Sequence, residues 1–106
     1  MSEPRDEARD KPALPVAIPV TGDLDLHSFA PREIPALVED YVQECRERGI
    51  LRVRLAHGRG RGVQRAVVRR ALLALPHVVS VADAAPEAGG WGATIAVLLP
   101  RDPRAE

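Results

Sequence analysis

Apolar residues recur at helical spacing across residues 34–48. The apolar positions there follow the i, i+3, i+4, i+7 pattern that places side chains on one helix face: Ile34, Leu37, Val38, Tyr41, Val42 and Cys45. Pro35 suits the first turn of a helix, where the N–H that proline lacks would have no intrahelical partner. Gly49 suits the left-handed residue that often follows a last turn. The pattern therefore predicts an amphipathic helix that ends at Arg48.

A second helix is predicted over residues 63–75, and Pro76 ends it because proline cannot continue a helix. A glycine-rich stretch, HGRGRG at residues 57–62, directly precedes this helix. The residues that we expect on its buried side are apolar and mostly small: Val63, Ala66, Val67, Ala71, Ala74 and Leu75.

Shorter segments carry the pattern of strands. Residues 23–27 (DLDLH) and 50–56 (ILRVRLA) alternate apolar and polar positions, which is typical of half-buried strands. Residues 78–84 (VVSVADA) predict a third strand. Residues 93–99 (ATIAVLL) predict a fourth, and their continuous apolar character indicates burial on both faces.

The order of these segments predicts the fold class. Each of the first two strands leads into a helix, and because such crossovers are right-handed, the two strands should be parallel neighbours. The last two strands are joined by a segment short enough for a hairpin. We therefore expect an α/β two-layer sandwich in βαβαββ order, with a mixed four-stranded sheet and two helices.

Length and composition bound the domain organisation. The chain has 106 residues, which suits one compact domain. Residues 1–15 are charged, contain prolines and lack apolar periodicity, so we expect a disordered tail there. The domain is predicted over residues 16–99, and residues 100–106 are predicted to be a frayed end.

Simple sequence features exclude several classes of protein. No stretch approaches the roughly 20 apolar residues of a membrane span, and the charged N-terminus lacks the apolar run of a signal peptide. The single cysteine, Cys45, excludes an internal disulfide and a thiolate-rich zinc site. We therefore expect a cytoplasmic protein with no membrane partner, in which Cys45 is a buried apolar side chain. Nothing in the pattern specifies an oligomeric state.

Charge is balanced overall but not along the chain. There are 15 basic and 15 acidic side chains, so no whole-molecule field attracts nucleic acid. Between Arg46 and Arg70, however, nine arginines accompany one acid, Glu47. Such a local basic region is a footprint of nucleic-acid binding, whereas its alternative is an ordinary solvated surface. The residues that would form a phosphate-tracking face are Arg52, Arg54, Arg65, Arg69 and Arg70.

Candidate chemistry gathers where the first two strands end. Asp25 and His27 are two apart on the first strand, so their side chains share a face. His57 follows the second strand, and the carboxyl ends of parallel strands open onto one edge of a sheet. The Gly58–Gly62 loop then leads into a helix, whose free N–H groups and positive dipole end favour an anion. The residues that we expect to contact phosphate or nucleic acid are Gly58, Arg59, Gly60, Arg61, Gly62, Arg65 and Trp91.

Each candidate residue also has a plainer interpretation. His57 and His27 either transfer protons at a phosphodiester or cap the strand and hydrogen-bond the loop. Asp25 either orients a histidine, accepts a loosely held metal ion or is the polar side of an exposed strand. Trp91 either stacks on a base or covers the hairpin as an apolar plug.

Three motifs occur in a fixed order: LDLH at 24–27, HGRGRG at 57–62 and GGWGATIAVL at 89–98. Together they resemble the Smr domain, the small MutS-related module, in the form of a stand-alone bacterial member. The resemblance covers about residues 16–99 and implies an α/β sandwich. It also implies nucleic-acid binding and, as in several members, endonuclease activity on DNA or RNA. The active-site candidates that it implies are Asp25, His27, His57, Gly58, Arg59, Gly60 and Gly62.

Three hypotheses fit these residues. The first is an endonuclease in which His57 and His27 share proton transfer, while Asp25 orients one of them or helps place a metal; the cofactor that the pattern admits is a loosely held Mg²⁺ or Mn²⁺. The second is a module that binds RNA, a ribosome or a DNA junction without cutting it. The third is a site for a small phosphorylated ligand. The sequence does not distinguish DNA from RNA.

Overall fold

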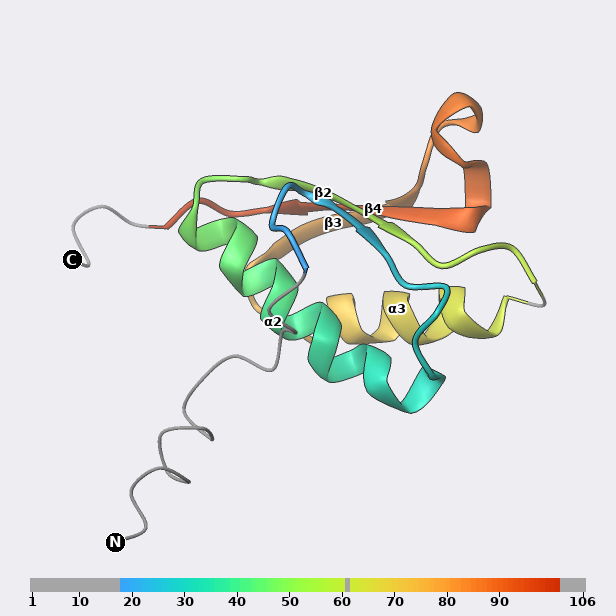
Figure 1. The fold of residues 1–106 in the computed structure, drawn as a ribbon. Coiled ribbons are helices and arrows are strands. Elements are labelled where there is room, and N and C mark those ends of the chain that lie inside the picture. The colour runs from blue at the N-terminus through green and yellow to red at the C-terminus, as the bar shows by residue number, and fades with distance from the viewer. Residues whose placement is uncertain (1–17, 61, 102–106) are drawn as a thin grey trace, which may run out of the picture.

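The computed structural model describes residues 18–60 and 62–101, and in this part of the chain a four-stranded sheet lies on a layer of two helices (Figure 1). The predicted α/β two-layer sandwich is confirmed. The helices are α2 (Ile34–Glu47) and α3 (Val63–Leu73). The strands are β1 (Asp23–Asp25), β2 (Arg52–Ala56), β3 (Val78–Asp83) and β4 (Ala93–Leu98). The tail predicted over residues 1–15 lies outside the described residues.

The sheet has the mixed topology that the sequence predicts. Its strand order is β1-β2-β4-β3, with β1 and β2 parallel and β4 antiparallel to both of its neighbours. Asp25 lies opposite Ala56, so the carboxyl ends of β1 and β2 meet at one edge. The central strand β4 has five of its six residues buried, which accounts for its continuous apolar sequence.

The two helices differ in how well their buried faces could be predicted. All six residues of the predicted α2 stripe are buried, and Gly49 has a φ of +79° after the helix. On α3 the prediction was wrong in part, because the buried residues are Val68 and Leu72, while Val63 is 56 % exposed. Three of the predicted residues pack against the core but are only half-buried: Val67, Ala71 and Leu75. Alanine and valine fit either side of a helix, so they did not define the α3 face.

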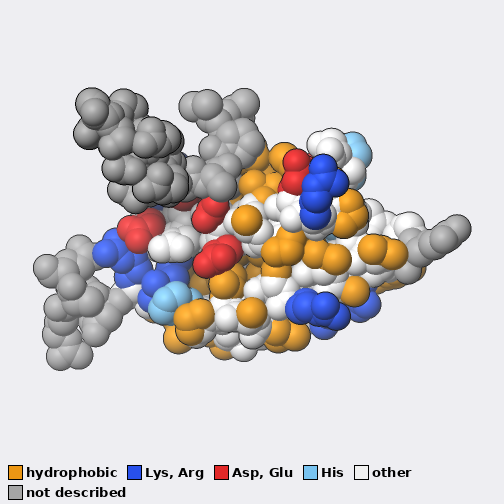
Figure 2. Space-filling view, turned by 90° about the horizontal axis from the view of Figure 1, so that it is seen from below, with side chains coloured by type: hydrophobic (Ala, Val, Ile, Leu, Met, Phe, Trp, Pro, Cys, Tyr) orange, Lys and Arg blue, Asp and Glu red, His pale blue; other side chains and the backbone are white. Residues whose placement is uncertain are grey.

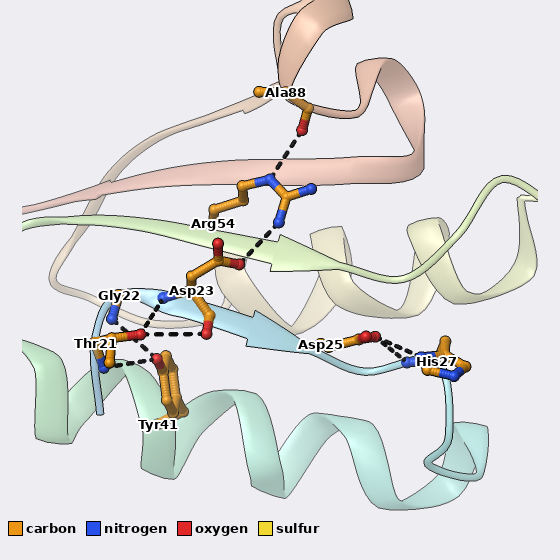
Figure 3. Close-up of polar contacts among 8 residues, drawn as sticks. All are labelled: Thr21, Gly22, Asp23, Asp25, His27, Tyr41, Arg54 and Ala88. Atoms are coloured by element: carbon orange, nitrogen blue, oxygen red, sulfur yellow. Dashed lines mark hydrogen bonds and ion pairs between the residues drawn. The ribbon is translucent and has the colours of Figure 1, made fainter. Parts of the chain in front are cut away.

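A tyrosine anchors the start of β1 to α2. Tyr41 is fully buried, and its hydroxyl oxygen accepts hydrogen bonds from the backbone N–H groups of Thr21 at 3.2 Å and Gly22 at 3.0 Å (Figure 3). These amides precede the strand and have no place in its ladder. The tyrosine therefore fixes where β1 begins.

Tyr41→Phe is expected to lower the free energy of unfolding by about 1–3 kcal/mol, because it leaves the buried amide of Gly22 without an acceptor. Urea unfolding followed by circular dichroism measures this loss. Val42→Ala, on the same helix face, is a control that shortens a buried side chain and leaves the Tyr41 hydroxyl in place. An unfolding midpoint for Tyr41→Phe equal to that of the native chain would contradict the anchoring role.

The face of the sheet away from the helices is partly covered by the segment between β3 and β4. This segment contains two short 3-10 turns, Pro86–Ala88 and Gly90–Gly92. Arg54 holds it in place: its Nε donates to Ala88 O at 2.9 Å, and its Nη1 donates to Asp23 Oδ1 at 2.8 Å (Figure 3).

Among the described helices, none has the length and apolar character that a membrane crossing requires.

Candidate functional site

Two glycine-rich loops pack against each other at the edge where β2 ends. The backbone N–H groups of His57 and Gly58 both donate to Gly92 O, at 3.0 and 2.9 Å. A Cβ atom added at Gly92 would lie 3.1 Å from Arg59 Cγ, and one added at Gly90 would lie 2.9 Å from Arg59 Nη2. The backbone of the 57–60 loop therefore approaches Gly92 so closely that glycine is favoured there, and the Arg59 side chain lies across the loop of Gly90 and Gly92.

The turn that follows β1 joins the same edge. Leu26 N donates to Ala56 O at 2.7 Å, and Phe29 N donates to Leu26 O at 3.0 Å, which closes a turn around His27. Gln64, in the first turn of α3, donates from Nε2 to Phe29 O at 3.2 Å. The structure thus brings all three sequence motifs together, with His27 on a turn held against the start of α3.

Asp25 and His27 form an exposed pair. Asp25 Oδ1 lies 2.7 Å from His27 Nδ1 and also accepts a hydrogen bond from His27 N at 3.0 Å (Figure 3). The hydrogen bond from the His27 side chain, followed by that from its backbone, lowers the pKa of Asp25, so the carboxylate is ionised near neutral pH. Because the carboxylate accepts from Nδ1, the neutral ring carries its hydrogen there and leaves Nε2 as the basic atom. The two side chains are 64 % and 72 % exposed, so that atom can reach a substrate.

His57, unlike His27, is buried. It is 4 % exposed, and its Nδ1 lies 2.9 Å from Gly58 O while its Nε2 lies 2.8 Å from Thr94 Oγ1. A carbonyl oxygen can only accept, so Nδ1 donates to Gly58 and the Thr94 hydroxyl donates to Nε2. Burial lowers the pKa of His57, which keeps the ring neutral. Both ring nitrogens are therefore occupied within the protein.

The lowered pKa of His57 gives a testable pH dependence. Below its ordinary pKa of 6.5, a histidine in the unfolded chain binds a proton that the folded His57 resists. Stability should therefore fall as pH drops below about 6.5, by up to about 1.4 kcal/mol per pH unit until the folded pKa is reached. Urea unfolding at pH 7.5 and 5.5 measures this loss, and His57→Gln should reduce it. An identical pH dependence in both proteins would contradict this origin.

The loop before α3 has the backbone geometry of an anion site. Gly58, Gly60 and Gly62 have φ angles of +82°, +37° and +80°, which favour glycine. Gly62 is the N-cap of α3 and offers no side chain to its first amides. The loop and the first turn line an open hollow made by His57, Gly58, Arg59, Gly60, Gly62, Val63 and Gln64. Arg61 lies outside the described residues.

Arg65 and Trp91 lie beside this loop but are already engaged with other side chains. Arg65 Nη2 donates to Asp83 Oδ1 at 2.8 Å and to Asp83 Oδ2 at 3.0 Å. Its Cζ lies 5.8 Å from the centroid of the Trp91 ring, within cation–π range. Trp91 is 41 % exposed and lies over Gly62, where an added Cβ would be 3.8 Å from its Cζ3. Both interpretations of Trp91, base stacking and an apolar plug, stay predictions.

The described arginines between Arg46 and Arg70 do not form one basic face. Arg54 lies on the side of the sheet away from the helices, whereas Arg65 and Arg69 lie on α3 and pair with Asp83. Arg46 donates to Leu99 O at 2.7 Å, near the end of β4 that is remote from the loops. Seen from the helix side, the arginines form separate groups around an apolar centre (Figure 2). Of the two alternatives, one continuous phosphate-tracking face does not fit this arrangement, because Arg52 and Arg54 lie on β2 and the other three arginines lie on α3, in the helix layer.

Metal ligands are sparse in the described residues. They contain no group of three or more His, Cys, Asp or Glu side chains that could hold a metal ion. Asp25 Oδ1 already accepts from His27, so a metal there would depend on oxygen atoms of the substrate. Cys45 is a buried free thiol whose pKa is raised by burial.

Three polar residues of the site were missed at the sequence level. Thr94 fixes the ring of His57, Gln64 holds the His27 turn, and Asp83 binds two arginines. Thr94 had a signal, since it is the one polar residue in the otherwise apolar stretch of residues 93–99. Gln64 and Asp83 had none, because their partners lie 14 to 35 residues away in sequence and meet them only in the fold.

Comparisons with known proteins match most of this domain. The family model described as Smr domain matches residues 24–99. The chain is 37 % identical over 78 residues to Endonuclease MutS2 of Thermus thermophilus, covering 74 % of this chain and 10 % of that protein. It is 33 % identical over 79 residues to Endonuclease MutS2 of Lactococcus lactis subsp. cremoris, with the same coverage. The chain thus spans about a tenth of the length of these curated relatives.

Solved structures show the same fold. The Smr domain of Thermus thermophilus MutS2 has a TM-score of 0.71 and 36 % identity, over 76 % of this chain and all of that one. YdaL, a stand-alone small MutS-related protein from Escherichia coli, has a TM-score of 0.69 and 28 % identity, over 76 % of this chain and 66 % of that one. The fold therefore occurs both as a domain of a larger protein and in a stand-alone protein.

Proposed function

Since this chain belongs to the Smr domain family, we propose that it binds nucleic acid at the edge shared by β1 and β2 and cleaves phosphodiester bonds there. The observation that carries the proposal is the exposed Asp25–His27 pair, whose Oδ1–Nδ1 distance is 2.7 Å. Gln64 holds that pair's turn against the first turn of α3. A proton acceptor and an anion site are thus built from adjoining elements.

The phosphate is bound by the loop and the helix start. The backbone amides of Val63 and Gln64 begin α3 without a capping side chain, and the helix dipole favours a negative charge in front of them. The Arg59 guanidinium crosses the neighbouring loop, where Nη2 donates to Gly89 O at a long 3.4 Å. That weak contact leaves Arg59 able to turn toward a phosphate oxygen, with a charge-assisted hydrogen bond as the gain.

His27 performs the proton transfer. Its Nε2 accepts a proton from the attacking hydroxyl, which is a water molecule or, on RNA, the neighbouring 2′-hydroxyl group. Asp25 stabilises the imidazolium that forms, through the hydrogen bond that it already accepts from Nδ1. The His27 ring then returns the proton to the departing oxygen or to solvent.

His57 has a different role in this proposal. A general base must be within hydrogen-bond reach of the proton that it removes. Thr94 and Gly58 occupy both His57 nitrogens in the folded protein. We therefore assign His57 to holding the Gly58–Gly62 loop in its binding shape, rather than to the shared proton transfer that the sequence predicts.

The test is a cleavage assay with defined substrates. The purified chain is incubated with labelled single-stranded, duplex and branched DNA and RNA, in Mg²⁺, in Mn²⁺ and in EDTA. Product that appears with the chain and disappears for His27→Ala supports the proposal. Activity in EDTA would exclude an essential Mg²⁺ or Mn²⁺ at Asp25, and activity only with the metal would support one.

A binding module without cleavage is the second candidate. It is favoured by the inward position of His57, which leaves one histidine rather than two available to substrate. The curated relatives are named endonucleases, but the chain spans only about a tenth of their length. Substrate that is retarded in a gel but intact in every condition would select this candidate.

A further inference from the structure

A single carboxylate binds two arginines beside the proposed phosphate loop. Asp83, the last residue of β3, accepts hydrogen bonds from Arg65 Nε at 3.0 Å, Arg65 Nη2 at 2.8 Å and Arg69 Nη1 at 3.3 Å. The three side chains are only 39 %, 32 % and 30 % exposed. An Arg–carboxylate pair with two parallel hydrogen bonds in a partly dehydrated place is among the strong charge-assisted contacts.

Arg65 also contacts Trp91, which lies beside Gly62 of the loop. Arg65 Cζ lies 5.8 Å from the Trp91 ring centroid. Because Asp83 fixes the Arg65 guanidinium, this cation keeps its position against the Trp91 ring. Trp91 remains 41 % exposed beside Gly62. Asp83, Arg65 and Trp91 therefore form a chain of contacts, which we call the Asp83 clamp, that ends at an accessible aromatic surface.

The clamp reduces the positive charge and the hydrogen-bond donors that this side of the loop presents to a nucleic acid. Two guanidinium groups and one carboxylate leave a net charge of +1. The two best donor positions of Arg65 point at Asp83, so they are unavailable to a phosphate. Affinity for a duplex comes mainly from phosphate contacts, whereas an aromatic surface binds bases that are unpaired.

We propose that Asp83 determines the kind of strand that this site accepts. Asp83 holds Arg65 and Arg69 away from phosphate, and it holds Arg65 against Trp91. The site therefore binds a strand with an unpaired nucleotide next to the bound phosphate more tightly than it binds a duplex. The proposal rests on the proposed function, since it concerns the substrate of the same edge. It makes Asp83 a positioning residue, because Asp83 acts through Arg65 and Trp91.

The test compares Asp83→Asn with Asp83→Glu in the full chain. Each protein is titrated with a labelled single-stranded oligonucleotide and with its duplex, over a series of KCl concentrations. Asp83→Asn should bind the duplex several-fold more tightly, and the slope of log K against log [salt] should steepen by about 0.9 for each phosphate newly contacted. Asp83→Glu keeps a carboxylate and should retain the native preference. Trp91→Leu should lose about tenfold in single-strand affinity and little in duplex affinity.

Several results would overturn the clamp. One is an unchanged salt slope and an unchanged single-strand preference in a folded Asp83→Asn protein. Another is an Asp83→Glu protein that behaves like Asp83→Asn. If Asp83→Asn does not fold, Arg69→Gln replaces it: loss of a cation that Asp83 already holds away from phosphate should leave the duplex slope unchanged. A slope smaller by about 0.9 would refute the clamp.

The clamp and the proposed function fail in distinguishable ways. A native chain that binds none of the oligonucleotides overturns both. A native chain that binds, combined with variants that keep its strand preference, overturns only the role of Asp83.

Discussion

His27→Ala is expected to slow phosphodiester cleavage by about 10²–10⁴-fold while leaving nucleic-acid affinity within a few-fold. The large loss is expected because Nε2 of His27 is the exposed basic atom at the edge, with Asp25 fixed on Nδ1 at 2.7 Å. The small change in affinity is expected because the phosphate is bound by Gly58–Gly62 and the first turn of α3. The measurement is single-turnover cleavage of a labelled strand, with affinity measured separately under conditions that prevent turnover.

His77→Ala is the matched control for this variant. His77 is also an exposed histidine, but it precedes β3 at the end of the sheet opposite Asp83. Its removal should leave both the rate and the affinity unchanged. If His27→Ala cleaves as fast as His77→Ala, the proton-transfer role of His27 is wrong. If both variants lose affinity together, the effect is a general loss of fold and the melting curves will show it.

His57→Ala is expected to lower the free energy of unfolding by roughly 2–4 kcal/mol. The ring is 4 % exposed and joins Thr94, on the central strand, to the backbone of the loop at Gly58. Its removal leaves a cavity and takes away the acceptor of the buried Thr94 hydroxyl. Urea unfolding at pH 7.5 measures the loss, and affinity for nucleic acid should fall as the loop loses its support.

Thr94→Val separates the two contributions. Valine keeps the shape of threonine but removes the donor to His57 Nε2, so the expected cost is smaller, about 1 kcal/mol. The alternative role for His57, direct proton transfer, predicts a different outcome. A His57→Ala protein of native stability and native affinity that fails to cleave would restore His57 to the chemistry.

Much of the fold could be predicted because apolar residues repeat at different spacings in its helices and its strands. The α2 stripe repeats at helical spacing and is buried at every predicted position. The parallel pairing of β1 with β2 follows from the helix that joins them. The α3 face was mispredicted in part because alanines on both sides of that helix blur its stripe, and only packing against the sheet selects Val68 and Leu72.

The position of the site could be predicted from the sequence, but most hydrogen-bond partners of its side chains could not. Strand order brought His27 and His57 to one edge, as expected. The direction of each side chain followed the alternation of its own strand: His57 is two residues after the buried Leu55, whereas His27 is two residues after the exposed Asp25. The Asp83 contacts depend on where β3 ends relative to α3, which no local pattern in the sequence encodes.

Nucleic-acid binding at the edge shared by β1 and β2 is tested most directly by finding which backbone amides respond to a bound strand. A ¹⁵N-labelled full chain is titrated with a short single-stranded oligonucleotide, and the amide chemical shifts are followed by NMR. We predict that the largest changes occur at Gly58, Gly60, Gly62, Val63 and Gln64, together with the turn around His27. Amides on the exposed side of α2, such as Glu39 and Gln43, should stay unchanged. Large shifts on α2 with none at the loop, or no shifts at all, would contradict binding at this edge.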